Sequence, residues 1–565
     1  MADFKQPVMG RRTFVKGGIA ASALVALAGC GKKGGDTTTA STTSTSGGTL
    51  NYYLNNPECI DPFNCQEDQG TQVCYQLFDS LVSYDFSKSQ LVPLAATSWE
   101  ASDDATKFTF HLAEGAKFSN GDAVDAKAFK RGWERIVNPN TLTTGDDTAS
   151  ASPSVISYHL AMVQGYDELQ AGNATEMPGL TCPDDNTFVV QLTAPYADFP
   201  YVCSHPALVP VPQAAIDDHK TFYYAPIGNG PFKMSGKWED GQYIDIVKND
   251  DYYGDSKATI DGVHFNIQKD AETAYKEFQA GNIDVAEVPT SMIDDALKTY
   301  GQSDDGFTIT PGKQILLGDE LSTYYIAVNV KDPVMADVNL RRAISLAINR
   351  QAICDTLFSG TRNPADNIVP PGIKGYEEGA WAYSKYDKDA AVALLDQYYP
   401  AGSDGKRNLS LTLSYNLDGS HKQIMESVIS DLNAVGIDVA STTKEWAAIL
   451  DDYDAGDFQM GRLGWIADYP IMDNFLYPLF YTGNGDNRSQ YSNADVDAAI
   501  TEARTTTDDD QRISKLQAVN KTIAEDMPVI PLMFYKHQVC GSSKIQSLYV
   551  DPQKKADMSQ CELSS

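Results

Sequence analysis

The sequence contains few of the residue patterns that carry chemistry. Its 565 residues include no His-Glu-x-x-His, Gly-x-Ser-x-Gly or Gly-Lys-Ser/Thr motif, and its seven histidines are scattered. No Cys-x-x-Cys pair is present, which removes the commonest spacing of zinc ligands. Catalytic groups can lie far apart in a sequence, so these absences do not exclude an enzyme. They leave nothing in favour of one, and we expect no enzymatic activity, no cofactor and no resident metal.

Positive charge is also scarce. The chain has 44 Lys and Arg against 76 Asp and Glu, a formal net charge of −32. Such a field repels phosphate backbones and anionic lipids, which excludes nucleic acid as a partner. Beyond the N-terminus no apolar run reaches the roughly twenty residues that a membrane-spanning helix needs. The composition, 42% hydrophobic and 10% aromatic, is that of a folded globular protein, and the length predicts two or three domains.

The first thirty residues have the parts of an export signal. A basic stretch at 11–16 precedes an apolar run at 19–28, which is too short to cross a bilayer. The pair Arg11-Arg12, followed by Phe and Lys, resembles a twin-arginine signal. We therefore expect residues 1–29 to be a signal peptide.

The residues at the end of this signal predict a lipid anchor. Leu27-Ala28-Gly29-Cys30 resembles the lipobox of bacterial lipoproteins, in which cleavage precedes the cysteine and its thiol is lipidated. An ordinary signal with a chance cysteine is the alternative. The segment 30–47, rich in Gly, Ser and Thr, reads as a flexible linker. We expect an extracytoplasmic protein held on the outer face of the bacterial cell membrane by Cys30.

Eight further cysteines raise the question of disulfides. In an exported protein we favour disulfides over metal binding. Cys182 with Cys203, and Cys540 with Cys561, would each close a loop of about twenty residues. Sequence alone leaves the connectivity open, because eight cysteines can pair in many ways. The eight are Cys59, Cys65, Cys74, Cys182, Cys203, Cys354, Cys540 and Cys561.

The body of the chain alternates strand and helix patterns. Apolar residues recur at every second position in the predicted strands and at three- and four-residue spacing in the predicted helices. This alternation predicts an α/β protein with several mixed sheets flanked by helices. The predicted strands include 49–53, 108–112, 188–192 and 437–439, and the predicted helices 123–136, 340–357, 387–398 and 421–435.

Several ordered segments resemble one protein family. They include a strand, turn and helix over 108–133, a glycine-rich stretch at 228–233, Ala280-Gly281-Asn282-Ile283-Asp284, and the run from Asn329 to Arg350. Together they resemble the extracytoplasmic solute-binding proteins of peptide ABC transporters, the oligopeptide/dipeptide-binding family 5. The resemblance covers nearly all of residues 49–565, in the order in which the family has these segments.

The resemblance implies a two-lobed clamshell, the periplasmic-binding-protein fold of the class with an extra domain. Lobe I would be discontinuous, lobe II continuous, and ligand would be enclosed when the lobes close about a hinge. The implied boundaries are 48–78, 213–321 and 537–565 for lobe I, 79–212 for the extra domain and 322–536 for lobe II.

The residues expected to hold ligand cluster in one segment. Arg462-Leu463-Gly464-Trp465-Ile466-Ala467-Asp468-Tyr469 resembles the "GWxADY" stretch of oligopeptide binders, in which an aspartate pairs with the α-ammonium group of the peptide. Asp468 stands at that position, and every peptide carries this ammonium whatever its side chains. Gly464 and Ile466 would offer backbone groups to an extended peptide, as in strand addition. Read without the family, Ala-Asp-Tyr-Pro is only a turn.

Other residues match positions that contact ligand in the family, and three of them have a second interpretation. Arg462 is expected to meet the carboxylate of shorter peptides, or else to form an internal salt bridge. Trp446 would line a side-chain pocket or be a core aromatic. His421 would meet a peptide C-terminus or simply begin a helix. Trp465, the pair Tyr324 and Tyr325, and the lobe I patch Gln66, Glu67 and Asp68 complete the predicted contacts.

One departure from the family pattern is informative. Ser322 and Ile466 stand where some members have two cysteines that pair across the hinge, so that bridge is absent here.

The function that these expectations imply is peptide capture for transport. The protein would bind short peptides and deliver them to the permease subunits of an ABC transporter, and we expect it to be a monomer. The alternatives are the same fold with a non-peptide solute, such as a nickel chelate, haem, sugar or opine, a peptide-sensing lipoprotein without a transporter, and a secreted hydrolase.

Overall fold

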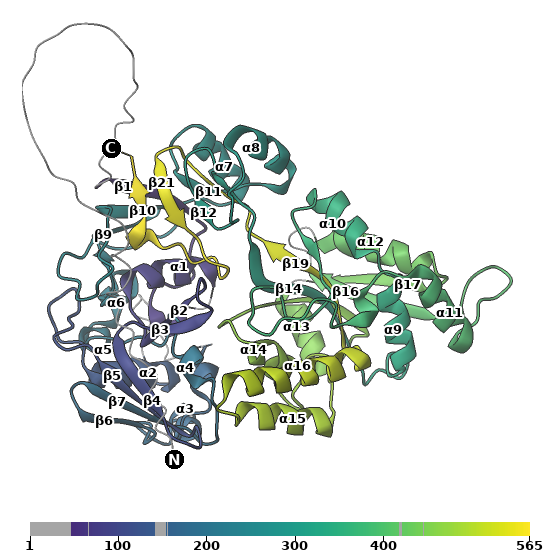
Figure 1. Cartoon of the computed structure of the whole chain (residues 1–565), viewed down its shortest axis with the longest axis horizontal. Helices are drawn as coiled ribbons and strands as arrows, with labels where there is room; N and C mark the ends of the chain where they lie inside the picture. The colour runs from purple at the N-terminus through teal and green to yellow at the C-terminus, as the bar shows by residue number, and fades with distance from the viewer. Residues whose placement is uncertain are drawn as a thin grey trace, which may run out of the picture.

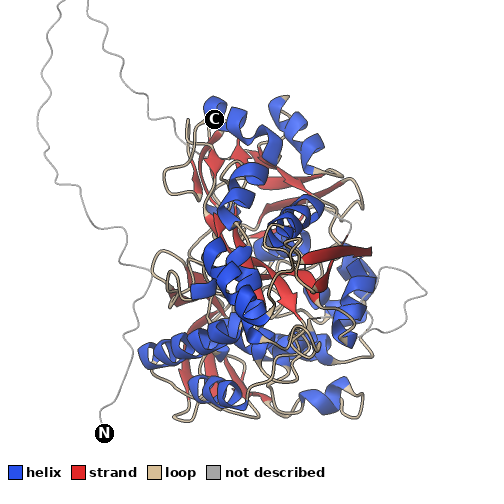
Figure 2. Cartoon of the chain, turned by 90° about the vertical axis from the view of Figure 1, so that its right-hand side faces the viewer, coloured by secondary structure: helices blue, strands red, loops and turns tan. Residues whose placement is uncertain are grey.

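The computed structural model describes residues 47–65, 67–141, 154, 156–416, 421–444 and 446–564. The predicted signal peptide, Cys30, the linker before Gly47 and Gln66 therefore lie outside the described residues. Within them, no helix is long and apolar enough to cross a membrane. The described chain forms an α/β structure in which three sheet-based units lie side by side (Figure 1). Helices and strands alternate through all of them (Figure 2).

The seven-stranded unit contains both the start and the end of the folded chain. Its sheet has the order β13-β20-β11-β1-β10-β9-β8, with the N-terminal strand β1 (Thr49–Leu54) parallel to both of its neighbours. Chain segments far apart in sequence therefore fold together. The other elements are β8 (Phe232–Met234), β9 (Tyr243–Lys248), β10 (Gly262–Ile267), β11 (Val285–Glu287), β12 (Thr308–Ile309), β13 (Ile315–Leu316), β20 (Val539–Gly541), β21 (Ile545–Tyr549), β22 (Glu562–Leu563), η2 (Pro62–Asn64), α1 (Asp68–Leu77), α5 (Ala214–Asp217), α6 (His219–Tyr224), α7 (Ala271–Gln279), η4 (Thr290–Met292), α8 (Ile293–Tyr300) and η6 (Met558–Gln560).

The four-stranded unit is antiparallel, in the order β4-β5-β7-β6. The helix α2 (Ala126–Val137) packs on it and buries Trp133 against Phe188, with the two rings edge to face at 5.1 Å. Burial of rings of this size dominates such a core. The remaining elements are β2 (Val82–Asp85), β3 (Gln90–Pro93), β4 (Ala96–Ala101), β5 (Lys107–Leu112), β6 (Leu180–Asp184), β7 (Thr187–Gln191), η3 (Ser157–Leu160), α3 (Tyr166–Gln170) and α4 (Phe199–Val202).

The six-stranded unit has the largest core and the order β15-β19-β14-β18-β16-β17. Its long strand β14 (Asp319–Val328) is buried along nearly its whole length between two antiparallel neighbours. The remaining elements are β15 (Asn363–Pro364), β16 (Ser410–Asn416), β17 (Asp438–Lys444), β18 (Met460–Ile466), β19 (Val529–Lys536), α9 (Val338–Ala347), α10 (Arg350–Phe358), η5 (Ala382–Ser384), α11 (Lys388–Tyr398), α12 (His421–Asn433), α13 (Trp446–Ala455), α14 (Asp473–Phe480), α15 (Ala494–Arg504) and α16 (Asp509–Asp526).

Two short crossings connect the seven-stranded and six-stranded units. β13 ends at Leu316 and β14 begins at Asp319, while β19 ends at Lys536 and β20 begins at Val539. β14 and β19 are paired with each other, so the two crossings run beside one another through the middle of the molecule (Figure 1). A few residues at the ends of elements are where hinge rotation between domains is usually absorbed. The predicted lobe boundaries at 321 and 537 stay a prediction.

Buried charges join the four-stranded and six-stranded units. Arg512 on α16 pairs with Asp198 at 2.7 Å, and their side chains are 6% and 3% exposed. Nearby, the Tyr196 hydroxyl donates to Asp473 at 3.1 Å. Tyr469 of the six-stranded unit packs into the apolar core of the four-stranded unit. These two units are therefore packed together with desolvated groups at their interface.

The expected secondary structure is largely present, with one helix divided in two. The predicted helix 387–398 is α11. Asp387 is its cap, as expected, because the Asp387 side chain accepts a hydrogen bond from the Ala390 amide. The predicted helix 340–357 is wrong as one element, since α9 ends at Ala347 and α10 starts at Arg350. Asn349 caps the second helix through the Ala352 amide, and an extended Ile348 separates the two.

The expected disulfides are not formed in the structure. All eight described cysteines are free, and Cys540 and Cys561 lie in separate clusters of buried apolar residues. The spacing argument failed because two cysteines close in sequence were assigned to one loop without knowledge of the packing.

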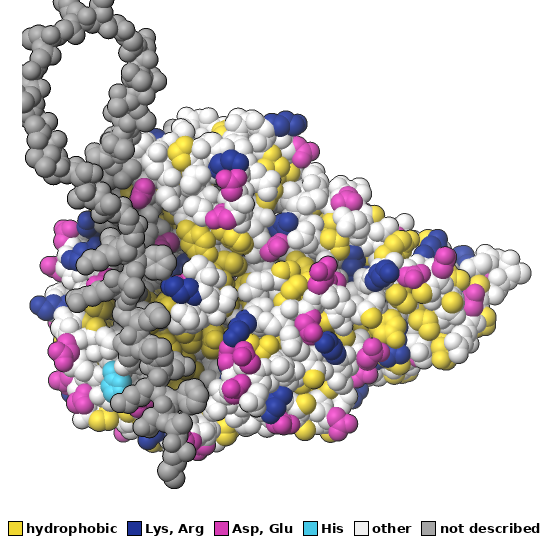
Figure 3. Space-filling model, in the orientation of Figure 1, with side chains coloured by type: hydrophobic (Ala, Val, Ile, Leu, Met, Phe, Trp, Pro, Cys, Tyr) yellow, Lys and Arg dark blue, Asp and Glu magenta, His cyan; other side chains and the backbone are white. Residues whose placement is uncertain are grey.

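On the surface, acidic and basic side chains are interspersed on the face drawn in Figure 3, with no broad basic area.

Candidate ligand-binding cleft

The open edge of β18 is the feature around which the predicted ligand residues gather. The Ala467 backbone amide donates to the Leu321 carbonyl, and the Asn329 backbone amide donates to the Gln459 carbonyl. The odd-numbered residues of β18 are therefore the ones in hydrogen-bonded pairs with β14. In an antiparallel ladder the alternate residues point their backbone groups the other way. β16 pairs with β18 only at Met460 and Gly461. The amide and carbonyl groups of Gly464 and Ile466 therefore face outward along an edge to which no described strand is added.

A carboxylate without a cation lies just past the end of this edge. Asp468 accepts from the Asn474 side-chain amide at 2.8 Å, and its own backbone amide donates to the Asn474 oxygen at 3.0 Å. Tyr158 lines the same cavity as Asp468. Burial is the main cause that raises the pKa of Asp468 above its ordinary value. Asn474 and Tyr158 are neutral, and no described Lys or Arg forms an ion pair with this carboxylate.

An arginine without a carboxylate lies farther along the same strand. The guanidinium of Arg462 stacks 4.7 Å from the Tyr324 ring and 5.8 Å from the Trp446 ring. Arg462 donates to the Asn416 side-chain oxygen at 3.3 Å, and its buried Nε has no hydrogen-bond partner among the described residues. Among the described residues no carboxylate forms an ion pair with Arg462, and both readings of this residue stay predictions.

Aromatic side chains form a wall beside Arg462. The Tyr324 hydroxyl lies 3.1 Å from His421 Nδ1, and the Tyr324 and Tyr535 rings are 6.0 Å apart. Trp446 is 39% exposed, so the core-aromatic reading is wrong. His421 does begin α12, as the alternative reading had it, and it also faces Tyr324. A cation and rings on one side of an open strand edge make a surface with places for both charge and apolar side chains.

Alternation along the strands sends other predicted residues to the opposite face. Tyr325 is 2% exposed and belongs to the core. The Trp465 indole donates to Asn474 at 3.2 Å. Because neighbouring residues of a strand point to opposite faces, Tyr325 and Trp465 are separated from Tyr324 and Arg462 by the sheet itself.

Two cavities adjoin this strand edge. One of about 920 Å³ lies between the four-stranded and six-stranded units and is lined by Asp468, Trp465 and Tyr158. Its arginines are already matched, Arg488 with two aspartates and Arg504 with Asp473. The other, of about 280 Å³, lies between the seven-stranded and six-stranded units and is lined by Tyr535, Asp68, Glu287, Glu320, Arg362 and Lys554. An ideal Cβ on Gly464 would lie 3.5 Å from the Tyr535 hydroxyl, so this second cavity reaches the edge of β18.

The predicted patch at 66–68 divides into different roles. Asp68 lines the smaller cavity and lies 3.3 Å from Lys554. Glu67 caps α1, accepting from the Gly70 amide at 2.9 Å and the Glu58 amide at 3.0 Å. Its carboxylate is thus used inside the protein, and the structure places only Asp68 of the described pair at the cleft.

Sequence reasoning missed several residues of this cleft. Asn474 holds Asp468, Tyr158 lines the same cavity, Tyr535 lies beside Gly464, and Lys554 pairs with Asp68. Tyr158 and Lys554 are isolated polar positions with no local pattern to single them out. Tyr535 follows a run of buried apolar residues in β19, and the pairing of Met533 with Tyr324 puts it on the same face as Tyr324.

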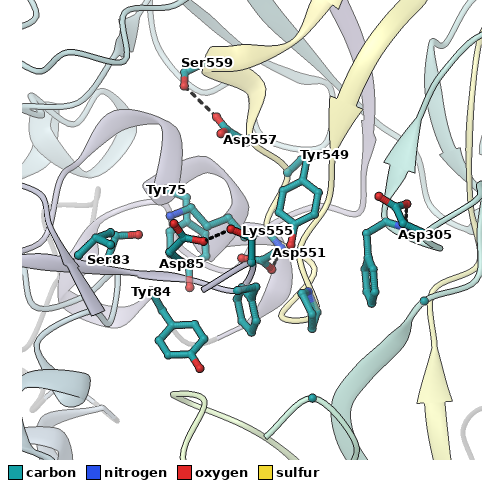
Figure 4. Close-up of a pocket in the computed structure, with 18 of the residues that line it drawn as sticks. Tyr75, Ser83, Tyr84, Asp85, Asp305, Tyr549, Asp551, Lys555, Asp557 and Ser559 are labelled. Atoms are coloured by element: carbon teal, nitrogen blue, oxygen red, sulfur yellow. Dashed lines mark hydrogen bonds between the residues drawn. The ribbon is translucent and has the colours of Figure 1, made fainter. Parts of the chain in front are cut away.

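A further cavity lies behind the two crossings. It measures about 1020 Å³, and Figure 4 shows Asp85, Asp305, Asp551 and Asp557 around Lys555. Asp319 of β14 lines this cavity while Glu320 lines the cleft, so the two spaces lie on opposite faces of the strand. None of the predicted ligand residues lines it. Asp551 accepts from the amides of Gln553 and Lys555, and Asp557 from Ser559 at 2.8 Å, so these carboxylates are already satisfied.

Metal binding has no structural support in the described part of the chain. No three His, Cys, Asp or Glu side chains among these residues come together in a way that could hold a metal ion.

Comparison with protein-family models finds one match. The model described as "Bacterial extracellular solute-binding proteins, family 5 Middle" matches residues 90–487. Proteins of this description bind solutes, and the match spans parts of all three sheet-based units.

Individual proteins match over most of the chain. The dipeptide-binding protein DppE of Bacillus subtilis is 27% identical over 549 residues, covering 95% of this chain and 96% of the relative. A probable deoxycholate-binding periplasmic protein of Escherichia coli, YgiS, is 29% identical over 491 residues, covering 85% and 86%. These relatives are named as binding proteins, and their names give different ligands.

A solved structure supports the same fold. The unliganded open form of MppA, a periplasmic murein tripeptide binding protein, superposes with a TM-score of 0.75 at 25% identity, covering 92% of this chain and 99% of that chain. The architecture of three sheet-based units is thus shared with a known binding protein.

Proposed function

The chain belongs to family 5 of the bacterial extracellular solute-binding proteins, and from this premise we propose that it binds short peptides along the open edge of β18. The observation that carries the proposal is the Asp468 carboxylate, which is partly buried, has a raised pKa and forms no ion pair with any described Lys or Arg. An uncompensated carboxylate away from water is unfavourable unless a cation arrives to pair with it. The α-ammonium group of a peptide is such a cation.

The other end of a peptide has a matching partner. An Arg462 guanidinium nitrogen lies 3.9 Å from the ideal Cβ position of Gly464, so the positive charge stands beside residue 464. Residue 468 lies four positions after residue 464 and two beyond the end of β18, so the separation is roughly 13 Å at about 3.3 Å per extended residue. An extended zwitterion of three or four residues spans that distance. Asp468 and Arg462 would hold its two ends, while Gly464 and Ile466 would pair with its backbone as an added strand does.

Ligand capture would involve closure of the molecule. The seven-stranded unit is proposed as lobe I, the six-stranded unit as lobe II, and the four-stranded unit as the extra domain. The two crossings at 317–318 and 537–538 would act as the hinge. Closing would bring Asp68 and its neighbours over a peptide that already lies against β18.

Delivery and anchoring complete the proposal. The protein would pass its peptide to the permease subunits of an ABC transporter and would be tethered outside the cell membrane by a lipid on Cys30. The Leu27–Cys30 sequence supports the anchor. Replacing Cys30 by Ser should release the protein from the membrane fraction into the medium or periplasm, and unchanged membrane association would contradict the anchor.

The decisive experiment is substitution of the amine partner. Asp468→Ala should weaken binding of trialanine by more than about a hundredfold, because loss of one member of a buried pair costs roughly 3–5 kcal/mol. The melting temperature of the ligand-free variant should stay nearly that of the wild type. Calorimetry measures both, with Asp486→Ala as a matched control in the same cavity. Wild-type affinity in Asp468→Ala would refute the assignment of the amine partner.

A non-peptide solute is the second candidate, because the relative YgiS is named as a probable deoxycholate-binding protein. A bile acid has a carboxylate and no ammonium, so it would leave Asp468 uncompensated. Mass spectrometry of the molecules released on denaturing the purified protein separates the candidates. Short peptides of mixed sequence would support the first, and a single amine-free solute would support the second.

A further inference from the structure

Two opposite charges without ion-pair partners lie on the two walls of the smaller cavity. Glu287 ends β11 on the seven-stranded wall, and Arg362 precedes β15 on the six-stranded wall. No described Lys or Arg forms an ion pair with Glu287, and no described Asp or Glu forms one with Arg362. Both side chains line the same space of about 280 Å³. The cavity therefore separates two groups that would attract each other if its walls approached.

These two residues are held at opposite ends of the crossing at 537–538. Glu287 pairs with Val539 in the ladder between β11 and β20, just after the crossing. The Arg362 guanidinium donates to the carbonyl of Lys536, just before the crossing. Lys536 and Val539 are three positions apart, which is roughly 10 Å at about 3.3 Å per extended residue. A small rotation at this crossing is therefore enough to change the separation of the two charges.

Gln538, within the crossing, is bound to both units. Its side-chain amide donates to the Thr361 hydroxyl at 2.7 Å, and its side-chain oxygen accepts from the Thr290 hydroxyl at 3.1 Å. Gln538 and Thr361 are 6% and 3% exposed. Thr361 is the residue before Arg362, and Thr290 is three positions after Glu287. A buried point that joins the two walls can act as a pivot, about which the side chains that face the cavity approach or separate.

The lysines of this cavity already have partners. They contact acidic or aromatic side chains: Lys554 lies 3.3 Å from Asp68 and 3.7 Å from Glu320, Lys536 lies 3.7 Å from Asp319, and Lys555 lies 4.3 Å from the Tyr75 ring. Arg362 lies against the rings of Tyr535 and Phe358, at 5.0 Å and 5.6 Å. A guanidinium has five N–H donors, so it can stay on these rings, keep its bond to a carbonyl and still bind a carboxylate.

We propose that Glu287 and Arg362 form an ion pair when the seven-stranded and six-stranded units close, and that this latch stabilises the closed state. The inference rests on the proposed function, in which these units close over a peptide. Closure would shrink the cavity and remove water from both charges, and pairing offsets the cost of that desolvation. Because the latch forms after the peptide has bound to β18, it should slow release of the peptide more than it speeds capture.

Zero-length cross-linking tests the contact directly. Arg362→Lys keeps the charge and supplies a primary amine, and a water-soluble carbodiimide joins this amine to a carboxylate with loss of one water. In the full mature chain, peptide mapping by mass spectrometry should find an amide bond between residues 287 and 362, and trialanine should raise its yield several-fold. Adding Glu287→Gln to the same chain should abolish the bond.

The cross-link also separates the latch from the proposed function. A bond that forms by spontaneous closure in a protein to which trialanine does not bind would support the latch and count against the peptide. Binding of trialanine with no bond at residue 287, or with a bond only to Lys554 of the same unit, would overturn the latch.

Affinity measurements test whether the pair stabilises the closed state. Glu287→Gln and Arg362→Gln should each raise the dissociation constant for trialanine about two- to fivefold, the range for a partly exposed ion pair. The double variant should lose no more than either single variant, because both remove the same interaction. Stopped-flow kinetics should place the loss in the dissociation rate. Glu272→Gln, which breaks an exposed pair with Lys276 on α7 of the same unit, is the matched control and should leave the affinity unchanged.

Trialanine amide distinguishes a latch from a direct contact with the ligand. The latch predicts the same loss for the amide as for the free acid in Arg362→Gln, because the partner of Arg362 belongs to the protein. A loss confined to the free acid would assign Arg362 to the carboxylate of the peptide and overturn the latch. Additive losses in the double variant would overturn it as well.

Discussion

At the scale of single residues, the cleft is defined by two charges that form no ion pair with any described residue. A carboxylate and a guanidinium are normally paired when they leave water, because desolvation of an isolated charge is costly. Here Asp468 rests against neutral groups and Arg462 lies among aromatic rings. The two charges have opposite sign and stand at opposite ends of an open strand edge. Their arrangement is complementary to a zwitterion, and it makes separate predictions for each end of a peptide.

The amino end predicts a pH dependence of affinity. Asp468 must be ionised to pair with an ammonium group, and burial raises its pKa in the free protein. Pairing with an ammonium group lowers the pKa of the same carboxylate in the complex. Between the two pKa values the free protein carries a proton on Asp468, and binding releases it. Within that interval the dissociation constant should rise by up to about tenfold per pH unit.

Titration calorimetry with trialanine between pH 7 and pH 4 measures this effect. Asp468→Asn is the control, because its affinity should be low and should lack the proton release. The assignment fails if the variant and the wild type show the same dependence on pH.

The carboxyl end predicts a preference for free acids over amides. Arg462 should make the wild type bind trialanine more tightly than trialanine amide by about 2 kcal/mol, as charged hydrogen bonds do. Arg462→Ala should lose that preference. Because the variant also loses contacts with Tyr324 and Trp446, the cycle of two proteins and two ligands isolates the charge interaction. A preference that survives in the variant would assign the carboxylate to another residue.

At the scale of elements, the open edge of β18 explains how a site can recognise peptides as a class. β14 occupies one side of β18 from Met460 to Ile466, and β16 occupies only the first two positions of the other side. An added peptide backbone would complete the ladder. Such pairing depends on main-chain groups and is indifferent to side chains.

Proline substitution tests this geometry within one strand. Ile466→Pro removes an amide that faces the open edge, so it should cost about tenfold in peptide affinity and little in thermal stability, because proline is tolerated where the amide faces outward. Trp465→Pro is the matched control, since its amide belongs to the ladder with Thr323 and its loss should lower the melting temperature. Denaturation scans and titration calorimetry separate the two effects. Equal destabilisation by both variants would mean that Ile466 is not at an open edge.

At the scale of the whole molecule, the two interfaces of the six-stranded unit differ in kind. With the seven-stranded unit it shares two short crossings and a cleft, whereas with the four-stranded unit it shares a buried ion pair and a common apolar cluster. Burial raises the pKa of Asp198 to about 6 even though Arg512 is beside it. Keeping the Asp198 carboxylate charged is therefore costly once Arg512 is removed.

Arg512→Ala should accordingly lower the free energy of unfolding at pH 7 by about 3–5 kcal/mol, and Asp198→Asn in the same chain should restore part of it. The loss should shrink toward pH 5, because the unpaired Asp198 takes up a proton more readily in the folded protein than in the unfolded chain. Arg342→Ala, which breaks a pair with the exposed Glu525, is the control and should cost less than about 1 kcal/mol. Equal losses in both variants, measured by calorimetry, would show that the interface is not held by the buried pair.

Local patterns in the sequence predicted elements well where a cap or an alternation was decisive. Asp387, the acidic residue just before α11, caps that helix as predicted. The alternating runs form β5 and β7. They failed where a tertiary contact intervened. Asn349 looks like an ordinary helix residue, yet its amide is held by Asp431 and its side chain starts a new helix. The disulfide expectation failed for a similar reason, since spacing says nothing about which cores two cysteines enter.

The sequence by itself determined the family, the α/β class and the segment from Arg462 to Asp468, because each depends on residues that are neighbours along the chain. Only the tertiary structure decided that, among the described residues, no cation pairs with Asp468, no carboxylate pairs with Arg462 and no strand is added to the outer edge of β18 beyond Gly461. The physical reason is that the charge state, the pairing and the desolvation of a group depend on what surrounds it. At this site those surroundings come from Tyr158, Asn474 and Tyr535, which are brought to β18 from different parts of the chain by folding.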